Sequence, residues 1–139
     1  MDIAKASPFL GAHSKAVLVT LRSDGRPQSS NIVYHWNGEA ALISVTESRA
    51  KTANLRRDPR AALHVSSNDF WQYVVVDGTV QVSSVTTEAG DPVGRELLDV
   101  YNAIASDPHP DPDEFYAAMV AEQRLVLRLE PGSFYGTVL

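Results

Sequence analysis

The fold is decided by residues 15–46, which read KAVLVTLRSDGRPQSSNIVYHWNGEAALISVT. Two turn signals divide this stretch, Asp24-Gly25 and Asn37-Gly38, because Asn, Asp and Gly readily adopt the positive φ that tight hairpins need. Three segments rich in β-branched and aromatic residues are predicted as strands: Lys15–Leu21, Gln28–Trp36 and Glu39–Thr46. The stretch therefore predicts an antiparallel meander of three strands.

The rest of the chain adds helices and further strands. Ser48 is predicted to cap a helix over Ala50–Arg57, which Asp58-Pro59 ends. Two more helices are predicted over Pro92–Ser106 and Asp113–Ala121, and a short N-terminal one begins with Ser7 as its cap and Pro8 in first position. The further strands are predicted at Arg60–Ser66, Gln72–Ser83 with a bulge at Gly78, Gln123–Leu129, and Phe134–Val138 after a Pro131-Gly132 turn.

About seven strands with short connections indicate a mainly β fold. Long strands in a small domain tend to close into a barrel, which avoids exposed edges. We therefore expect residues 1–139 to form one domain, an antiparallel β-barrel with peripheral helices. There is no alternating βαβ pattern and no G-x-G-x-x-G sequence, so a Rossmann domain is not expected.

Composition excludes several classes of protein. The chain has no cysteine, which rules out disulfides, thiolate nucleophiles and Cys-ligated metals and suits a cytoplasmic protein. It has no apolar run of about 18 residues, so no membrane span is predicted, and Met1–Ala12 lacks the apolar core of a signal peptide. The net charge of −5 argues against a general nucleic-acid binder.

Positive charge is concentrated in one segment. Five of the 12 Lys and Arg residues lie between positions 49 and 60, opposed there only by Asp58: Arg49, Lys51, Arg56, Arg57 and Arg60. The first N–H groups of a helix lack internal partners, and its dipole already places positive charge there. Cations at Arg49 and Lys51 therefore favour a bound anion, with Asn54 three residues on along the same helix face. The alternative is a solvated helix face, and Arg56, Arg57 and Arg60 fit that better.

Two other clusters are candidates for binding a flat ring. Gln28-Ser29-Ser30-Asn31 are four consecutive polar residues in a strand, able to bond the polar edge of a heterocycle or to form a wet edge. Phe70-Trp71-Gln72-Tyr73 could form a stacking wall, part of a subunit interface, or core. The four histidines show no metal-ligand spacing, and His64 is predicted as a core residue. No G-x-S-x-G or H-E-x-x-H motif supports a hydrolase.

With these residues assembled, the chain resembles the split-β-barrel proteins related to pyridoxamine 5′-phosphate oxidase, and most resembles the actinobacterial branch that uses the deazaflavin coenzyme F420. The resemblance spans nearly the whole chain. It rests on three blocks: Ala16–Leu21, Asp24–Asn31 and Arg49–Ala61. The last block, RAKTANLRRDPRA, is the most specific.

The resemblance implies an FMN-binding type of split barrel that forms a homodimer with cofactor sites at its interface. The strand residues would line the deazaflavin ring, the helix start would take the phosphate and the beginning of the oligoglutamate tail, and the aromatics would come from the other subunit. The cofactor-binding residues expected on this basis are Gln28, Ser29, Ser30, Asn31, Ser44, Thr46, Arg49, Ala50, Lys51, Asn54, Trp71 and Tyr73.

The activity implied is hydride transfer from reduced F420 to a small electrophilic substrate. In such a reaction the cofactor carries the chemistry, and the protein orients it and excludes water. The alternatives are an FMN-dependent oxidase or reductase, and a carrier that binds F420 or flavin without turnover. No metal is expected and no catalytic residue is assigned; Tyr34, His35 and bound water are the proton sources considered.

Overall fold

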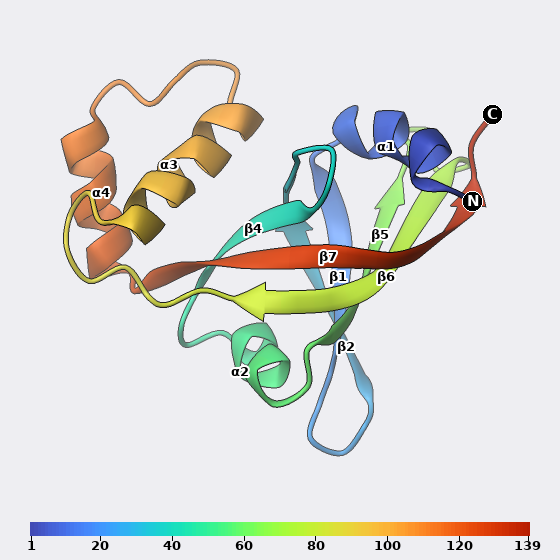
Figure 1. Cartoon of the computed structure of the whole chain (residues 1–139), viewed down its shortest axis with the longest axis horizontal. Helices are drawn as coiled ribbons and strands as arrows, with labels where there is room; N and C mark the ends of the chain where they lie inside the picture. Colours follow the sequence, from blue (N-terminus) through green and yellow to red (C-terminus); the bar gives the residue numbers. More distant parts are fainter.

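The computed structural model describes all of residues 1–139. Seven strands form one antiparallel sheet in the order β2-β1-β5-β6-β7-β4-β3. They are β1 (Lys15–Leu21), β2 (Pro27–Val33), β3 (His35–Trp36), β4 (Ala41–Thr46), β5 (Arg60–Ser66), β6 (Tyr73–Val82) and β7 (Arg124–Thr137). The helices are α1 (Ile3–Gly11), α2 (Ala50–Arg57), α3 (Pro92–Ile104) and α4 (Pro112–Ala121). In Figure 1, α1 and α2 lie at opposite ends of the strands, and α3 and α4 form a hairpin to one side.

The sheet curls on itself because one extended segment supplies both of its outermost strands. Residues 27–36 are interrupted at Tyr34, so that β2 pairs with β1 whereas β3 pairs with β4. The prediction of a single strand in a three-stranded meander is therefore wrong, although both hairpin turns are confirmed. The fully buried Tyr34 donates its hydroxyl to the Leu10 carbonyl at 2.7 Å. This hydrogen bond holds Tyr34, where β2 ends and β3 begins, against α1.

A cluster of 19 buried residues fills the barrel, drawn mainly from alternate positions of the strands. Helix α1 closes one end of this core with Ala6, Phe9 and Leu10. The helix begins at Ile3 under an Asp2 cap, so the prediction that Ser7 and Pro8 begin it is wrong. Asp2 accepts from the Lys5 N–H, and Ser7 instead accepts a hydrogen bond from the indole of Trp36 at 2.8 Å.

The longest strand, β7, runs without a turn through Pro131 and Gly132. The prediction of a turn at these two residues is therefore wrong. Pro131 pairs with Gly78 and Ser133 pairs with Asp77, so Gly132 is the extra residue of a β-bulge. A Cβ atom on Gly78 would lie 2.1 Å from the Glu130 carbonyl oxygen. The predicted irregularity at Gly78 is confirmed, and its cause is the close approach of the two backbones.

The α3–α4 hairpin packs on the outer face of the barrel. Leu97 of α3, Phe115 of α4 and Val126 of β7 form a second buried cluster, with Leu42 and Met119 against it. Asp91 caps α3, accepting from the Gly94 N–H and the Thr86 hydroxyl, both at 2.7 Å. None of the helices combines the length and the hydropathy that a membrane-spanning helix requires.

Candidate functional site

The start of α2 is open at the surface of the barrel. Arg49 is the N-cap residue and its side chain makes no capping bond, so the prediction that Ser48 caps this helix is wrong. The backbone N–H groups of Ala50 and Lys51 have no acceptor within the protein. The buried Thr52 hydroxyl donates to the Thr46 carbonyl at 2.9 Å and ties the helix start to the end of β4. Two unpaired N–H groups at a helix start are suited to an anion.

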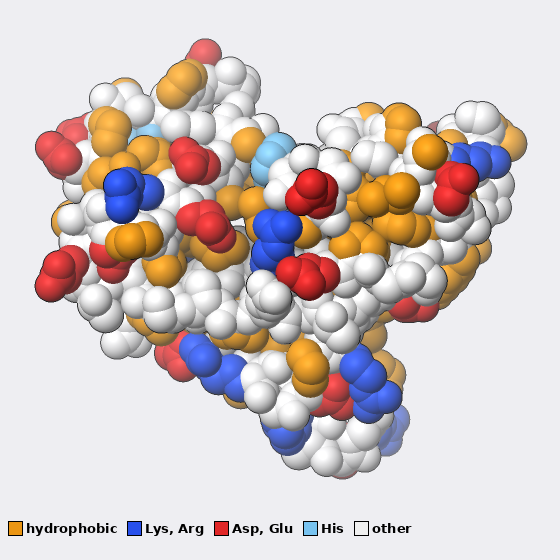
Figure 2. Space-filling model, viewed as in Figure 1, with side chains coloured by type: hydrophobic (Ala, Val, Ile, Leu, Met, Phe, Trp, Pro, Cys, Tyr) orange, Lys and Arg blue, Asp and Glu red, His pale blue; other side chains and the backbone are white.

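The five cations of this segment divide into two groups. Arg56 pairs with Glu47 at 2.6 Å and Arg60 with Asp58 at 2.8 Å, while Arg57 donates to the Leu21 carbonyl at 2.8 Å. In contrast, the side chains of Arg49 and Lys51 have no hydrogen bond or ion pair. Figure 2 shows Lys and Arg side chains gathered over α2 and the β1–β2 turn, whereas acidic side chains prevail over α3 and α4. Arg49 and Lys51 are thus the two cations of the segment left available.

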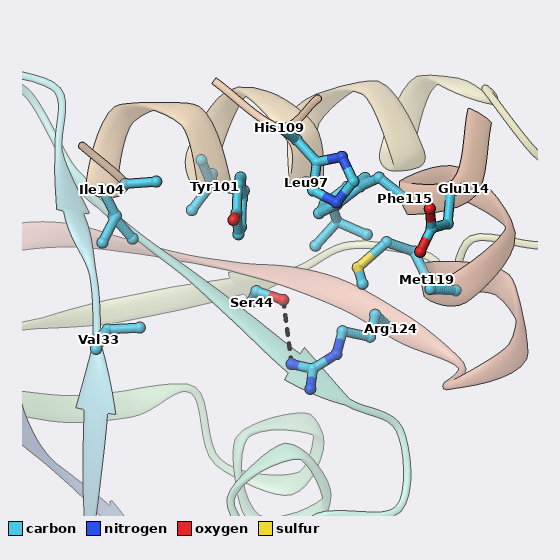
Figure 3. A pocket seen from close by; sticks show the side chains of 13 residues that line it. Val33, Ser44, Leu97, Tyr101, Ile104, His109, Glu114, Phe115, Met119 and Arg124 are labelled. Atoms are coloured by element: carbon cyan, nitrogen blue, oxygen red, sulfur yellow. Dashed lines mark hydrogen bonds between the residues drawn. The ribbon is translucent and has the colours of Figure 1, made fainter. Parts of the chain in front are cut away.

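A third cation, Arg124, joins them from β7. It pairs with Thr46 across the β4–β7 ladder, and its guanidinium donates to the Ser44 hydroxyl at 3.3 Å (Figure 3). Burial lowers the pKa of Lys51, and the positive charges of Arg49 and Arg124 lower it further. Of nearby acids, only Glu122 pairs with Arg124, at 3.1 Å. We name Arg49, Lys51 and Arg124 the cation cluster. Arg124 was not predicted from the sequence, because nothing in the sequence shows that β7 pairs with β4.

Asn54 is engaged inside the protein, unlike the side chains of Arg49 and Lys51. It is buried, and its amide donates to the Gln28 side chain at 2.8 Å and the Thr20 hydroxyl at 3.1 Å. Its carbonyl oxygen accepts from Arg57 at 3.0 Å. Both amide hydrogens are therefore used inside the protein. The geometry favours a positioning role, in which Asn54 holds α2 against β1 and β2.

The polar run Gln28–Asn31 is split between the two faces of β2. Gln28 and Ser30 are half-buried, whereas Ser29 and Asn31 are exposed on the other face, together with Val33. Four consecutive strand residues cannot all line one ring, because side chains alternate across a strand. On β4, Ser44 and Thr46 share the outer face and point away from the barrel core.

The aromatic run lies at the β5–β6 turn, away from α2. Trp71 is 76% exposed, and Tyr73 stacks on His64 with ring centroids 5.2 Å apart. His64 is half-buried between the core residues Leu63 and Val65, so it faces outward and the prediction of a core histidine is wrong. Within one chain the structure therefore does not bring Trp71 and Tyr73 to the cation cluster.

An apolar pocket of about 510 Å³ adjoins the cation cluster. Figure 3 shows Ser44 and Arg124 on one side of it and the α3–α4 hairpin on the other. A cavity of this size accommodates a small organic molecule. Of the proton sources considered earlier, Tyr34 is unsuitable, because its buried hydroxyl donates to Leu10 and burial raises its pKa.

The curled antiparallel sheet, its capping helices and the cation cluster beside an apolar pocket together define the class of split β-barrel proteins. The profile of the pyridoxamine 5′-phosphate oxidase family matches residues 3–137, and the chain belongs to that family. The fold expected from the sequence is thereby confirmed.

Solved structures of several relatives share this fold. A protein named F420 reductase is 25% identical over 93% of this chain and 94% of its own, with a TM-score of 0.68. A conserved hypothetical protein of Mycobacterium tuberculosis is 19% identical over 98% of this chain and 84% of its own, with a TM-score of 0.77. A heme storage protein of Vibrio cholerae is 14% identical over 98% of this chain and 95% of its own, with a TM-score of 0.67.

Proposed function

We propose that this protein is a reductase that uses reduced coenzyme F420 to transfer a hydride to a small electrophilic substrate, such as an activated alkene or a quinone. The observation that carries this proposal is the cation cluster, Arg49, Lys51 and Arg124, beside the two unpaired N–H groups that begin α2. The likeness to the protein named F420 reductase supports it.

The residues present fit such a cofactor. Lys51 has a lowered pKa because it is desolvated beside two other cations, an arrangement that an anion between them relieves. A phosphate would be held by Arg49, Lys51 and the N–H groups of Ala50 and Lys51, and tail carboxylates would extend the contact toward Arg124. FMN offers the phosphate without those carboxylates, so the presence of a third cation, Arg124, beside the available Arg49 and Lys51 favours F420. When bound, the deazaflavin supplies the hydride, and the protein's residues bind it and orient it.

We further propose that two copies of the chain complete the site. The outer face of β1, β2 and β5 carries a hollow lined by Val17, Asn31, Val33 and His64, and Val33 is half exposed. Trp71 lies on the turn that follows β5, exposed and away from its own chain's cation cluster. A partner seated on this face would cover the hollow and supply Trp71 to the neighbouring site.

The test is a comparison of two cofactors on the purified protein. F420 and FMN are titrated separately while tryptophan fluorescence is followed, and F420 is expected to bind more tightly. Tighter binding of FMN would contradict the proposal and favour an FMN-dependent oxidase or reductase.

A second measurement separates an enzyme from a carrier. Oxidation of reduced F420 is followed by its absorbance with 2-cyclohexenone and with menadione as acceptors. Consumption above the protein-free rate is expected with at least one of them. Tight binding without any such consumption would identify a carrier instead.

A further inference from the structure

The pocket beneath the α3–α4 hairpin is apolar on nearly every side. Leu97, Val100 and Ile104 of α3 and Met119 of α4 line it, and Tyr101 and Phe115 add aromatic rings. These residues come from the hairpin, whereas only Val33, Ser44 and Arg124 come from the barrel (Figure 3). Apolar walls of this kind bind the body of a ligand through burial of its surface.

His109 is a polar residue among the apolar residues that the α3–α4 hairpin contributes to the pocket. Its ring packs against Tyr101 and Phe115, with centroids 5.3 Å and 5.4 Å away. The Asp111 N–H donates to Nδ1 of His109 at 3.1 Å, and the His109 N–H donates to the Asn102 side chain at 2.9 Å. Because a backbone N–H can only donate, Nδ1 carries a lone pair, and the neutral ring has its hydrogen on Nε2.

The Nε2–H group of His109 is left as an available donor. It has no partner within the protein, and no buried side-chain nitrogen or oxygen lacks a partner, so Nε2 is reachable from outside the packed interior. Figure 3 shows His109 on the hairpin side of the pocket with one ring nitrogen directed inward. A neutral imidazole donor binds a carbonyl oxygen without introducing charge.

Charge on the hairpin side argues against an anionic ligand group there. Glu114 lines the same side of the pocket as His109 (Figure 3) and would repel a carboxylate. The positive charge lies on the barrel side, at Arg124, which belongs to the cation cluster. The pocket thus has apolar walls, and it has one neutral hydrogen-bond donor, His109, at the end remote from the cation cluster.

We propose that this pocket binds uncharged ring compounds that carry a carbonyl group, with the carbonyl oxygen accepting from Nε2–H of His109. As the compartment for the hydride acceptor, the pocket rests on the proposed function. As a binding site, it can be tested on the protein without cofactor.

The test compares three probes that differ only in the polar group: tetralin, 1-tetralone and tetralin-1-carboxylate. Each is titrated into the cofactor-free protein by NMR. One neutral hydrogen bond gives about a three- to ten-fold preference, so the ketone is expected to bind more tightly than the hydrocarbon by this factor, and the carboxylate most weakly. The ketone alone should also shift the nitrogen-15 signal of His109 Nε2. Equal affinity for ketone and hydrocarbon, or no binding of either, would overturn the proposal.

Two variants place the binding in this pocket. Met119→Trp should abolish binding of both tetralin and 1-tetralone by filling the cavity, whereas His109→Phe, which keeps an aromatic ring but has no donor, should remove the preference for the ketone and leave tetralin binding intact. His13→Ala, which alters a histidine outside the pocket, is the matched control and should change neither. Unchanged ketone binding in Met119→Trp would refute the assignment, and retained tetralin binding in His109→Phe shows that the α3–α4 hairpin still folds.

Failure of this inference is distinguishable from failure of the proposed function. If F420 binds but 1-tetralone does not, the substrate pocket is refuted and the cofactor assignment stands. If 1-tetralone binds but F420 does not, the assignment of the pocket as a binding site is supported. Its role as the acceptor compartment of an F420 reductase is then refuted.

Discussion

Lys51 differs from the arginines that follow it because it has no partner. Its pKa is lowered by burial and by two neighbouring cations, so its charge is unfavourable in the folded protein without an anion. Asn54 illustrates the opposite case, a polar side chain whose donors are all engaged in holding α2. Residues at a binding site often lack the internal partners that stabilise a fold.

The Lys51→Met variant should therefore bind F420 at least about ten-fold more weakly, since a charge-assisted bond is worth about 1.5–3 kcal/mol. Without cofactor, its melting temperature near neutral pH should equal or exceed that of the wild type. Because the pKa of Lys51 is lower when folded, the wild type should recover relative to the variant as pH rises through that folded pKa.

Fluorescence titration and thermal melting check the two halves of this prediction. Arg60→Met is the matched control, because Arg60 is exposed and paired with Asp58. It should leave F420 affinity unchanged. A less stable Lys51→Met protein with normal affinity would mean that Lys51 serves the fold alone.

Asp91 is the strongest capping residue among the elements of the fold. It accepts from the Thr86 hydroxyl and from the N–H groups of Thr87, Glu88 and Gly94, which together lower its pKa far below its ordinary value. Asp91→Ala should cost about 1–2 kcal/mol of unfolding free energy near neutral pH. The carboxylate's contribution is present above its unfolded pKa of about 4 and is lost as pH falls toward the folded value.

Chemical denaturation of Asp91→Ala at about pH 7 and at about pH 3 tests this, and the difference from wild type should shrink in acid. Asp111→Ala is a useful comparison, since Asp111 caps α4 with a single side-chain bond, to the Glu114 N–H at 3.1 Å. The Asp111→Ala variant should lose less unfolding free energy than Asp91→Ala. Equal losses at both pH values would contradict the assigned role of the Asp91 charge.

The β6–β7 bulge is the second element whose energetics can be tested. Gly78→Ala would place a methyl group against the Glu130 carbonyl, so the two longest strands must separate. Forcing extra volume into a packed site costs about 1–3 kcal/mol, and denaturant unfolding should show a loss of this size. Gly11→Ala is the control, because its new methyl would meet only Trp36 at 3.8 Å.

Element identity was predictable from the sequence to a large extent, and element pairing was not. Local patterns correctly predicted α2, α3, α4 and the strands β1, β4, β5 and β6 within a few residues. They failed at Tyr34 and at Pro131-Gly132, where distant partners decide the outcome: the Leu10 carbonyl receives Tyr34, and β6 holds β7 extended. Arg124 was missed for the same reason, since only the β4–β7 ladder carries it to Ser44.

At the scale of the whole molecule, the outer face of β1, β2 and β5 is where a second copy is proposed to bind. Val17→Asp introduces a charge into the hollow on that face. If two copies meet there, sedimentation should show a dimer for wild type and a monomer for the variant, because burying an unpaired carboxylate is costly. F420 affinity should fall as well, since Trp71 of the partner would be lost.

Thr79→Asp, at an exposed position of β6, is the control and should keep the wild-type sedimentation coefficient. A wild-type protein that sediments as a monomer at all concentrations would contradict the dimer. If the Val17→Asp protein remains dimeric, the interface between the two copies lies on another face.

The place of β7 in the sheet also governs when the protein can fold during synthesis. It is the last strand of this sheet to be synthesised, yet it lies between β6 and β4 and joins the two halves of the sheet. Until it emerges, β4 has only the two-residue β3 as its neighbour and β6 presents an unpaired edge. Closure therefore waits for translation to pass Thr137, and nascent chains halted before that point should depend on chaperones to protect those edges.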